Sequence, residues 1–370
     1  MSDIFHPEDF IIRQYAIPPG LHTLKLSAEA PSNIALVKYW GKKAEAEQIP
    51  MNPSVSFTLS RSKTTTQASL NLKKHPEKAP HLTFYLDGEH KPSFETKIRT
   101  FLERIRPYAP FVWDYDWVWH SHNTFPHGSG IASSASGFAA LAGLIMQLEE
   151  KIFGIRNNAF RRAKTSFLAR LGSGSAARSV AAPAMIWGRY AGVKTATDWY
   201  AVPLPFALHP DFEDVRDTII LFEQGQKAVS STQGHRLIHN HPFKHERIQQ
   251  AHRHMDGLLE ALRTGDWDTF GRITEAEALM LHALMMTSEP YYILMRPETL
   301  GFIQSLWNWR LIWEEQQHER PPVYFSLDAG ANVHLLYPGH WHTRVMEWLH
   351  ATVPDIMSHN AYIADSVAKE

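Results

Sequence analysis

The chain has 370 residues, and at about 150 residues per domain this length favours two domains. Lys and Arg number 37 against 38 Asp and Glu, a balance that argues against a protein that coats nucleic acid. Cysteine is absent, which excludes disulfides, zinc ribbons, iron–sulfur clusters and a cysteine nucleophile. The 22 histidines are the unusual feature of the composition, because a high histidine count is one sign of a metal protein.

Strand and helix signals mix along the chain without a regular βαβ alternation. Short or alternating apolar runs predict strands at 34–37, 54–60, 82–86 and 113–119, and a helical period begins at Ser133. The second half is predicted to hold a strand at 218–222, helices at 244–263, 267–286 and 297–315, strands at 323–326 and 333–337, and a helix at 342–353. This order favours an α+β fold with two lobes over a doubly wound sheet.

The chain divides into three predicted parts. Residues 1–25 look like an N-terminal extension, residues 26–190 form a first α+β domain, and residues 191–370 form a second α+β domain. The N-terminus is acidic and lacks the apolar core of a signal peptide, and the longest apolar run, 138–146, is about half as long as a membrane span. We therefore expect a cytoplasmic protein that binds neither membrane nor nucleic acid.

The strongest local motif is a glycine- and serine-rich loop that leads directly into a predicted helix. It reads Phe-Pro-His-Gly-Ser-Gly-Ile-Ala-Ser-Ser-Ala-Ser-Gly over residues 125–137. Unpaired N–H groups and the helix dipole attract phosphate at such a helix start, and the hydroxyls of Ser133 and Ser134 can hold phosphate or magnesium. The glycine spacing fits neither a Walker loop nor a dinucleotide fingerprint. A plain capped helix after a flexible turn is the structural alternative.

Four further features suit anionic ligands. A second loop, Gly-Ser-Gly-Ser at 172–175, is followed by Arg178, whose guanidinium can bind a carboxylate or a phosphate through two parallel hydrogen bonds. A polar segment at 229–234 could add a hydroxyl, and Lys38 and Lys42 could bracket a phosphate. Asp328 lies in a small-residue turn between two strands, where it is either a turn former or a general base. Taken together, these groups describe a phosphoryl-transfer site for two anionic ligands.

These motifs resemble the diphosphomevalonate decarboxylase family, within the galactokinase–homoserine kinase–mevalonate kinase–phosphomevalonate kinase superfamily. The resemblance is carried most specifically by Lys-Tyr-Trp-Gly-Lys at 38–42 and by Gly-Ser-Gly-Ser-Ala-Ala-Arg-Ser at 172–179. The matching stretches, in family order, are 30–42, 50–56, 123–138, 172–179, 229–234, 282–288 and 328–332. The resemblance implies the two-lobed fold of that superfamily, with the active site in the cleft between the lobes.

The resemblance also implies a reaction and its residues. It implies ATP- and Mg²⁺-dependent conversion of 5-diphosphomevalonate to isopentenyl diphosphate, ADP, phosphate and carbon dioxide, by a possible homodimer. The implied catalytic residues are Asp328 as base, Lys38, Arg178 on the substrate carboxylate, and Asn33, which would orient Arg178. The implied substrate-binding residues are Tyr39, Trp40, Gly41, Lys42, Ser173, Gly174, Ser175, Ala176, Ala177, Arg178 and Thr232. The implied ATP- and phosphate-binding residues are Pro126, Gly128, Ser129, Gly130, Ala132, Ser133 and Ser134, with Ser134 also on the metal.

Some positions depart from the family pattern and leave alternatives open. His127 and Ser129 are unusual in the phosphate loop, and His81 is the nearest candidate for a substrate-binding Arg found in some members. A phosphomevalonate decarboxylase, a mevalonate 3-kinase or an inactive ligand-binding homologue therefore remains an alternative. Since no metal-binding spacing appears, we interpret most histidines as surface residues and expect His282 to be buried and hydrogen-bonded.

Overall fold

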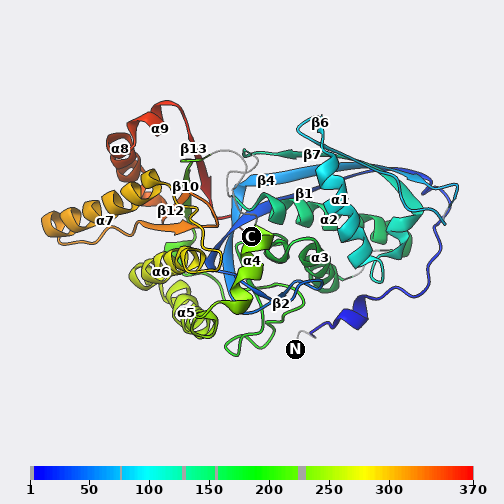
Figure 1. Ribbon diagram of the computed structural model, residues 1–370, viewed down its shortest axis with the longest axis horizontal. Coiled ribbons are helices and arrows are strands. Elements are labelled where there is room, and N and C mark those ends of the chain that lie inside the picture. Colours follow the sequence, from blue (N-terminus) through cyan, green and yellow to red (C-terminus); the bar gives the residue numbers. More distant parts are fainter. Residues whose placement is uncertain (1–3, 76, 127–130, 155–156, 224–230, 370) are drawn as a thin grey trace.

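Strand β4 (Ser54–Leu72) runs through the middle of the larger of two main sheets (Figure 1). This computed structural model describes residues 4–75, 77–126, 131–154, 157–223 and 231–369. β4 pairs antiparallel with β1 (Thr23–Val37) on one edge, and with β7 (Tyr115–Asn123) and β8 (Ala184–Trp187) on the other. The sheet is completed by β5 (Leu82–Leu86), β6 (Glu89–His90) and β9 (Val202–Pro203).

Three helices cover this sheet and form the first lobe with it. They are α1 (Pro92–Ile105), α2 (Ser133–Phe153) and α3 (Asn158–Gly172). α2 packs on β1 and β4 and buries the apolar face that its sequence period predicts, while α1 and α3 pack beside it. β9 belongs to the sheet although it follows residue 190, where we expected the domain boundary.

The second lobe is built on a four-stranded antiparallel sheet. Its order is β11 (Tyr324–Leu327), β12 (Val333–Pro338), β10 (Val215–Ile220) and β13 (Tyr362–Ser366). The helices of this half are α4 (Ser231–Leu237), α5 (Lys244–Thr264), α6 (Trp267–Met286), α7 (Pro297–Gln317), α8 (His342–Thr352) and α9 (Pro354–Ser358). The combination of an antiparallel sheet with separate helices agrees with the predicted α+β fold. No helix in the described ranges has the length and apolar character needed to cross a membrane.

The two lobes share one hydrophobic core. Side chains of β4 and α2 belong to the same buried cluster as side chains of β10, α5 and α6. Phe57 of β4 and Phe270 of α6, for example, stack with their ring centroids 6.0 Å apart. A shared core fixes the relative position of the lobes, so residues from both can form one site.

The N-terminal segment lies against the first lobe. Phe10 is 1% exposed, and its ring centroid is 4.9 Å from that of Phe167 and 5.5 Å from that of Phe160, both on α3. The N–H of Phe5 donates to the hydroxyl of Tyr200 at 3.0 Å. The segment that we expected to form an extension therefore contributes aromatic packing to the lobe.

A bulge in β4 is closed by a carboxylate from the last strand. The register of β1 against β4 jumps between Pro31 and Asn33, and it leaves residues 59–62 of β4 without a β1 partner. Asp365 of β13, 4% exposed, accepts hydrogen bonds from the N–H groups of residues 60, 61 and 62 at 2.7–3.1 Å. The carboxylate thereby satisfies three backbone donors that have no partner in the β1 ladder.

We expect Asp365→Ala to lower the free energy of unfolding by about 3 kcal/mol, because it leaves charge-assisted hydrogen bonds unmade and donors buried. Urea denaturation measures this loss. Glu319→Ala is the control, since Glu319 is an exposed carboxylate with no hydrogen bond in the described part of the chain. Equal stabilities of the two variants would contradict the role given to Asp365.

Candidate active site

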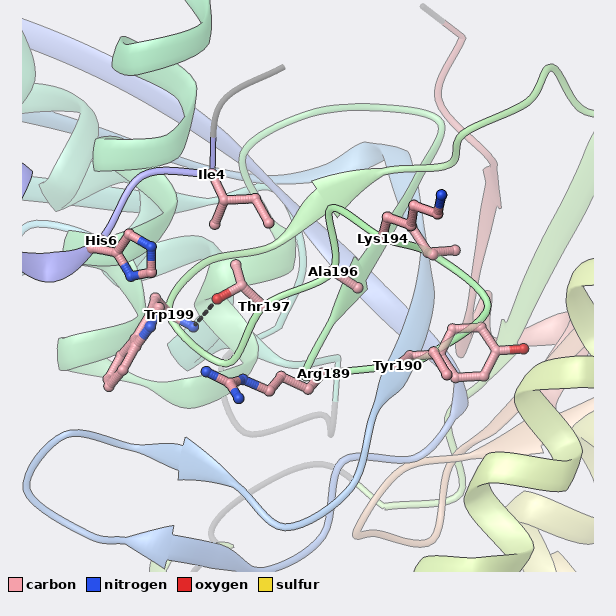
Figure 2. A pocket seen from close by; sticks show the side chains of 10 residues that line it. Ile4, His6, Arg189, Tyr190, Lys194, Ala196, Thr197 and Trp199 are labelled. Atoms are coloured by element: carbon pink, nitrogen blue, oxygen red, sulfur yellow. Dashed lines mark hydrogen bonds between the residues drawn. The ribbon is translucent and has the colours of Figure 1, made fainter. Parts of the chain in front are cut away.

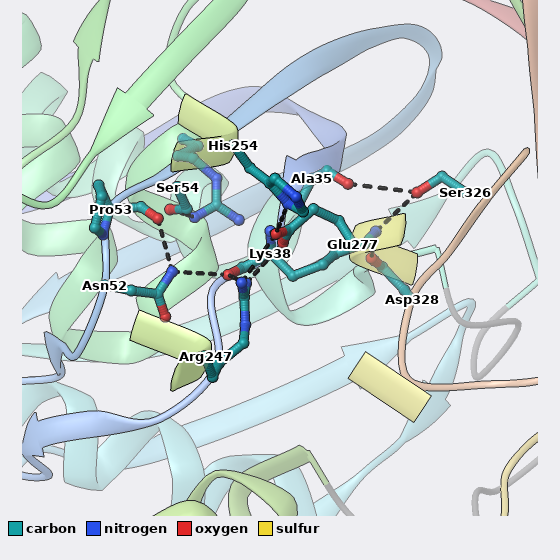
Figure 3. Close-up of polar contacts among 11 residues, drawn as sticks. Ala35, Lys38, Asn52, Pro53, Ser54, Arg247, His254, Glu277, Ser326 and Asp328 are labelled. Carbon is teal, nitrogen blue, oxygen red and sulfur yellow. Dashed lines mark hydrogen bonds and ion pairs between the residues drawn. The ribbon is translucent and has the colours of Figure 1, made fainter. Parts of the chain in front are cut away.

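Lys38 and Asp328 form a close ion pair where the lobes meet. Lys38 directly follows β1, and Asp328 directly follows β11. The Lys38 Nζ lies 2.9 Å from Asp328 Oδ1 and donates to the Ser326 hydroxyl at 2.9 Å (Figure 3). The Lys38 side chain is 3% exposed, whereas the Asp328 side chain is 24% exposed. The expected cation and the expected base, distant in sequence, are therefore neighbours, and the base is accessible to a ligand.

Arg178 lies at the end of a short 3₁₀ turn, Gly174–Arg178, that follows α3. Its guanidinium is buried and donates to the Ser56 hydroxyl at 3.1 Å and to the Ser54 hydroxyl at 2.6 Å. Burial lowers the pKa of Arg178 to about 10, so the group remains cationic at neutral pH. Sequence analysis missed the two serines as supports, because their alternation with apolar residues indicated only a half-buried strand.

Asn33 acts on the loop that carries Arg178 and not on the guanidinium. Its side-chain amide donates to the Ser179 hydroxyl at 2.7 Å and to the Ser175 carbonyl at 3.3 Å. No hydrogen bond joins Asn33 to Arg178 within the described residues, so any orienting effect of Asn33 on Arg178 passes through this loop. A short polar side chain on β1 can thus order the chain on both sides of Arg178.

The second Gly/Ser loop packs against Tyr39. A Cβ placed on Gly174 would lie 2.6 Å from the Tyr39 hydroxyl, and the hydroxyls of Ser173 and Ser175 lie 3.4 Å apart. The Tyr39 hydroxyl is buried with no hydrogen-bond partner in the described part of the chain, and burial raises the pKa of Tyr39. A buried donor without a partner is costly, so a polar ligand atom beside it would be stabilising.

We expect Gly174→Ala to lower the melting temperature and to raise the KM of the substrate, because the methyl group overlaps Tyr39 and overpacking costs about 1–3 kcal/mol. Calorimetry and steady-state kinetics measure the two effects. Gly301→Ala is the matched control, since a Cβ at Gly301 of α7 meets nothing within 4 Å. Unchanged KM in Gly174→Ala would show that the close approach to Tyr39 has no role in binding.

Lys42 is a buried lysine. The residue is 6% exposed, and its side chain makes no hydrogen bond or ion pair in the described part of the chain. Burial, reinforced by the positive charges of Arg104 and Arg236, lowers the pKa of Lys42 to about 8 despite the charge of Glu45. A cation kept unpaired in this way is available to an anionic ligand. Arg104 of α1 and Arg236 of α4 are the cations near it that sequence analysis missed, whereas His81, the expected substitute, is not among the charges that act on Lys42.

The titration of Lys42 predicts how binding depends on pH. Since the pKa is lowered, the cation is complete below about pH 8 and is lost as the pH rises through that value. We therefore expect kcat/KM for an anionic substrate to fall above about pH 8 in the wild type. The pH profile of Lys42→Met checks this expectation, because that variant should lack the alkaline limb. A limb at the same pH in both proteins would contradict the assignment.

The start of α2 has no capping hydrogen bond from its own N-cap side chain. Its N-cap residue, Ala132, has a left-handed backbone with φ of 42°, and its side chain makes no capping hydrogen bond. Ser133 and Ser134 form the first turn and line a small pocket of about 60 Å³ together with Thr64, Asn123 and Gly137. Pro126 is exposed beside this turn, and Gly128, Ser129 and Gly130 lie outside the described residues, as does His127. The described half of the predicted phosphate loop leaves helix N–H groups open to a ligand.

The remaining predicted substrate residues are mainly packing positions. Trp40 is buried in an apolar cluster with Ile238 and Leu281, and Gly41 has φ of 92°, which favours glycine. Ala176 and Ala177 are fully buried. Thr232 belongs to α4, and its side chain lies outside the described part.

Most of the described histidines are exposed, as expected, but four are buried. His235 is 8% exposed, and its Nδ1 accepts the Gly41 N–H at 2.9 Å between the rings of Tyr39 and Trp40. Burial holds the pKa of His235 well below its usual value, so the ring is neutral and able to accept. The expectation for His282 is confirmed: it is 1% exposed, and its Nε2 is hydrogen-bonded to the Asp328 carbonyl at 3.1 Å. The histidines therefore shape the site through packing and hydrogen bonds.

The described residues contain no cluster of three or more His, Asp or Glu side chains arranged to hold a metal ion.

A larger pocket lies apart from these residues (Figure 2). Its volume is about 430 Å³, and it is formed between the N-terminal segment and the loop that joins β8 to β9. The Thr197 hydroxyl accepts the Trp199 N–H at 3.2 Å within it. None of the predicted site residues lines this pocket, so the candidate active site remains the region around Lys38 and Asp328. The lining residues are Ile4, His6, Arg189, Tyr190, Ala191, Val193, Lys194, Ala196, Thr197 and Trp199.

Comparison with known proteins supports the resemblance from both halves of the chain. Residues 30–197 match the diphosphomevalonate decarboxylase-like N-terminal domain, and residues 218–370 match the mevalonate 5-diphosphate decarboxylase C-terminal domain. Diphosphomevalonate decarboxylase of Ganoderma lucidum is 29% identical, over 84% of this chain and 78% of its own length. Phosphomevalonate decarboxylase of Haloferax volcanii is 28% identical, over 84% of this chain and 88% of its own.

Solved structures extend the similarity to the fold. The crystal structure of mevalonate diphosphate decarboxylase from Staphylococcus aureus superposes with a TM-score of 0.78, at 28% identity, over 94% of this chain and 96% of that chain. A structure of MDDEF in complex with MVAPP, AMPPCP and magnesium superposes with a TM-score of 0.76, at 27% identity, over 93% and 97% of the two chains. Two domain matches that together span most of the chain, in the right order and on the right fold, lead to one conclusion: the chain belongs to the diphosphomevalonate decarboxylase family.

Proposed function

We propose that the protein catalyses the ATP-dependent decarboxylation of 5-diphosphomevalonate to isopentenyl diphosphate, with release of ADP, phosphate and carbon dioxide. The observation that carries this proposal is the pair of Lys38 and Asp328, 2.9 Å apart and open to solvent on the aspartate side. A base beside a fixed cation suits attack of a hydroxyl on a phosphoryl group. Arg178 and Lys42, both buried, supply two further cations, one for each anionic end of the substrate.

The proposed roles follow from these positions. Asp328 accepts the proton of the substrate 3-hydroxyl as its oxygen attacks the γ-phosphorus of ATP and ADP leaves. Lys38 neutralises charge on the transferred phosphoryl group, and Arg178 holds the substrate carboxylate. The tertiary phosphate then leaves with the electrons of its C–O bond, the carbon–carboxylate electrons form the new double bond, and carbon dioxide departs. Once Asp328 has passed its proton to solvent, its carboxylate stabilises the positive charge that develops at the carbon that loses the phosphate.

ATP and Mg²⁺ fit the start of α2. The N-cap residue, Ala132, supplies no capping side chain, and the hydroxyls of Ser133 and Ser134 are hard oxygen donors of the type that magnesium prefers. We propose that Ser134 and the nucleotide phosphates hold the ion, which supplies charge neutralisation of the phosphates when bound. The MVAPP, AMPPCP and magnesium complex of the similar MDDEF supports this use of ATP and Mg²⁺.

One assay tests the proposal. Purified protein is incubated with 5-diphosphomevalonate, ATP and Mg²⁺, and both ADP and carbon dioxide are measured. Equal amounts of the two products are expected. ADP without carbon dioxide would indicate a 3-kinase, and neither product would indicate a protein that only binds ligands.

Phosphomevalonate decarboxylase is the second candidate function, favoured by the 28% identity to the Haloferax volcanii enzyme over most of both chains. The monophosphate substrate lacks the distal phosphate, for which Lys42, Arg104 and Arg236 offer clustered positive charge. We therefore expect kcat/KM to be higher for the diphosphate than for the monophosphate. The opposite order would assign the second function.

We also propose that the protein works as a homodimer in the cytoplasm, where ATP is supplied. α7 exposes Leu300, Leu311 and Ile312, which are 46%, 58% and 53% accessible, and a second copy would cover apolar surface of this kind. Light scattering measures the mass in solution, and a monomer at micromolar concentration would contradict the dimer.

A further inference from the structure

The main chain of Lys38 is held by a buried polar cluster to which the roles above assign no function. The Lys38 N–H donates to Glu277 Oε2 at 2.8 Å. The Lys38 carbonyl accepts from Arg247 Nη2 and from Asn52 Nδ2, each at 2.9 Å (Figure 3). Since β1 ends at Val37, side chains take over both polar groups of this residue from the strand ladder.

Arg247 and Glu277 form a bidentate pair in the interior. Nη1 lies 2.9 Å from Oε1 and Nη2 lies 2.6 Å from Oε2, with the side chains 2% and 0% exposed. His254 adds a contact of 2.6 Å to Oε1. Burial pushes the pKa of Glu277 up, but the charge of Arg247 and the hydrogen bonds from His254 and Lys38 outweigh burial and leave the pKa below its usual value. Glu277 is therefore ionised at neutral pH and accepts from three residues.

The cluster joins the two lobes at the main chain of Lys38. Arg247 lies on α5 and Glu277 on α6, both in the second half of the chain, whereas Lys38 follows β1 of the first lobe. Asp328 also belongs to the second half, and it meets only the end of the flexible Lys38 side chain. Without a fixed main chain, the four-carbon stem would leave the ammonium free to move by more than an ångström.

We propose that Glu277 and Arg247 are positioning residues that hold the Lys38 main chain so that its ammonium stays against Asp328 during phosphoryl transfer. The proposal rests on the proposed function of Lys38 and Asp328. A displacement of about 1 Å in such a group can cost about 100-fold in rate. A buried ion pair is weak support for a purely stabilising role, because desolvation offsets most of its attraction.

A double-mutant cycle separates positioning from stability. Glu277→Gln, Lys38→Met and the double variant are measured under single-turnover conditions with enzyme in excess, so that slow variants stay measurable. We expect Glu277→Gln to lower the rate of ADP formation about 10- to 100-fold, with KM for ATP and substrate changed less than about threefold. In the Lys38→Met background, Glu277→Gln should lower the rate less than about twofold, since the group it positions is gone.

The matched control is Glu149→Gln. Glu149 pairs with Lys164 at 2.7 Å between α2 and α3, with side chains 3% and 1% exposed, and neither residue touches Lys38. We expect this variant to lower the melting temperature without lowering the rate. Where Glu277→Gln does not fold, Arg247→Lys replaces it in the same cycle. Lysine keeps the positive charge but cannot make the two parallel hydrogen bonds of a guanidinium group.

Three outcomes overturn the proposal. The rate losses of Glu277→Gln and Lys38→Met multiply in the double variant, Glu149→Gln lowers the rate as much as Glu277→Gln does, or Glu277→Gln leaves the rate unchanged. Failure of the proposed function has a different signature. In that case the wild-type protein itself forms no ADP from 5-diphosphomevalonate and ATP.

Discussion

Replacement of Asp328 by Asn is expected to lower kcat by about 10²- to 10⁴-fold, the range that a general base contributes. The amide is isosteric and can still accept from Lys38, so the fold and the position of Lys38 should persist. It cannot take a proton from the substrate hydroxyl, and it offers no negative charge to the cation that forms before carbon dioxide leaves. Quenched-flow measurement of ADP and carbon dioxide gives the loss in each step.

Nucleotide affinity is the control for Asp328→Asn. Asp328 lies at the end of β11, whereas the proposed nucleotide site is at the start of α2, so the dissociation constant for ADP should change less than about threefold. Turnover within tenfold of the wild type would contradict the role of Asp328 as base. Loss of nucleotide binding with loss of turnover would indicate a structural role instead.

Arg178→Ala is expected to lower kcat/KM by at least about 100-fold, because the substrate carboxylate loses its charged partner and the reacting groups lose their alignment. The substitution also leaves the Ser54 and Ser56 hydroxyls without the guanidinium that they accept from. A moderate fall in melting temperature should therefore accompany the loss of activity. Steady-state kinetics and calorimetry measure the two effects separately.

Arg178→Lys distinguishes charge from geometry. Lysine keeps the positive charge but lacks the fork that can serve Ser54, Ser56 and a carboxylate together. We expect it to recover part of the stability and little of the activity. Full activity in Arg178→Lys would show that charge alone suffices, and the geometric argument for the two serines would then fail.

The sequence predicted most long elements of the fold, because a strong period identifies them. α6 was expected at 267–286 and is Trp267–Met286, and α2 begins at Ser133 as expected. α1 and α3 were missed, since α1 opens with Pro92 after a charged turn and α3 carries six basic or hydroxyl side chains among its apolar residues. β13 was missed as well, because Tyr362–Ser366 is short and its pattern is weak.

Sequence motifs made the reacting residues of the site predictable. They gave no sign of the residues from distant segments that hold those residues in place. Lys38, Arg178 and Asp328 each belong to a motif that is recognisable in the sequence, and the structure brings Lys38 and Asp328 together. Glu277 and Arg247 lie on regular amphipathic helices, where a charged residue ordinarily faces solvent. Only the tertiary structure shows that both are buried against the main chain of Lys38.

The carboxylate of Asp365 has a consequence for how the chain is made. Residues 60–62 leave the ribosome about 300 residues before the group that satisfies their N–H donors is synthesised. The first lobe can therefore reach its final form only when the last strand is released and docks beside β4. Proteins that lack the last six residues also lack Asp365 and should accumulate as incompletely folded chains.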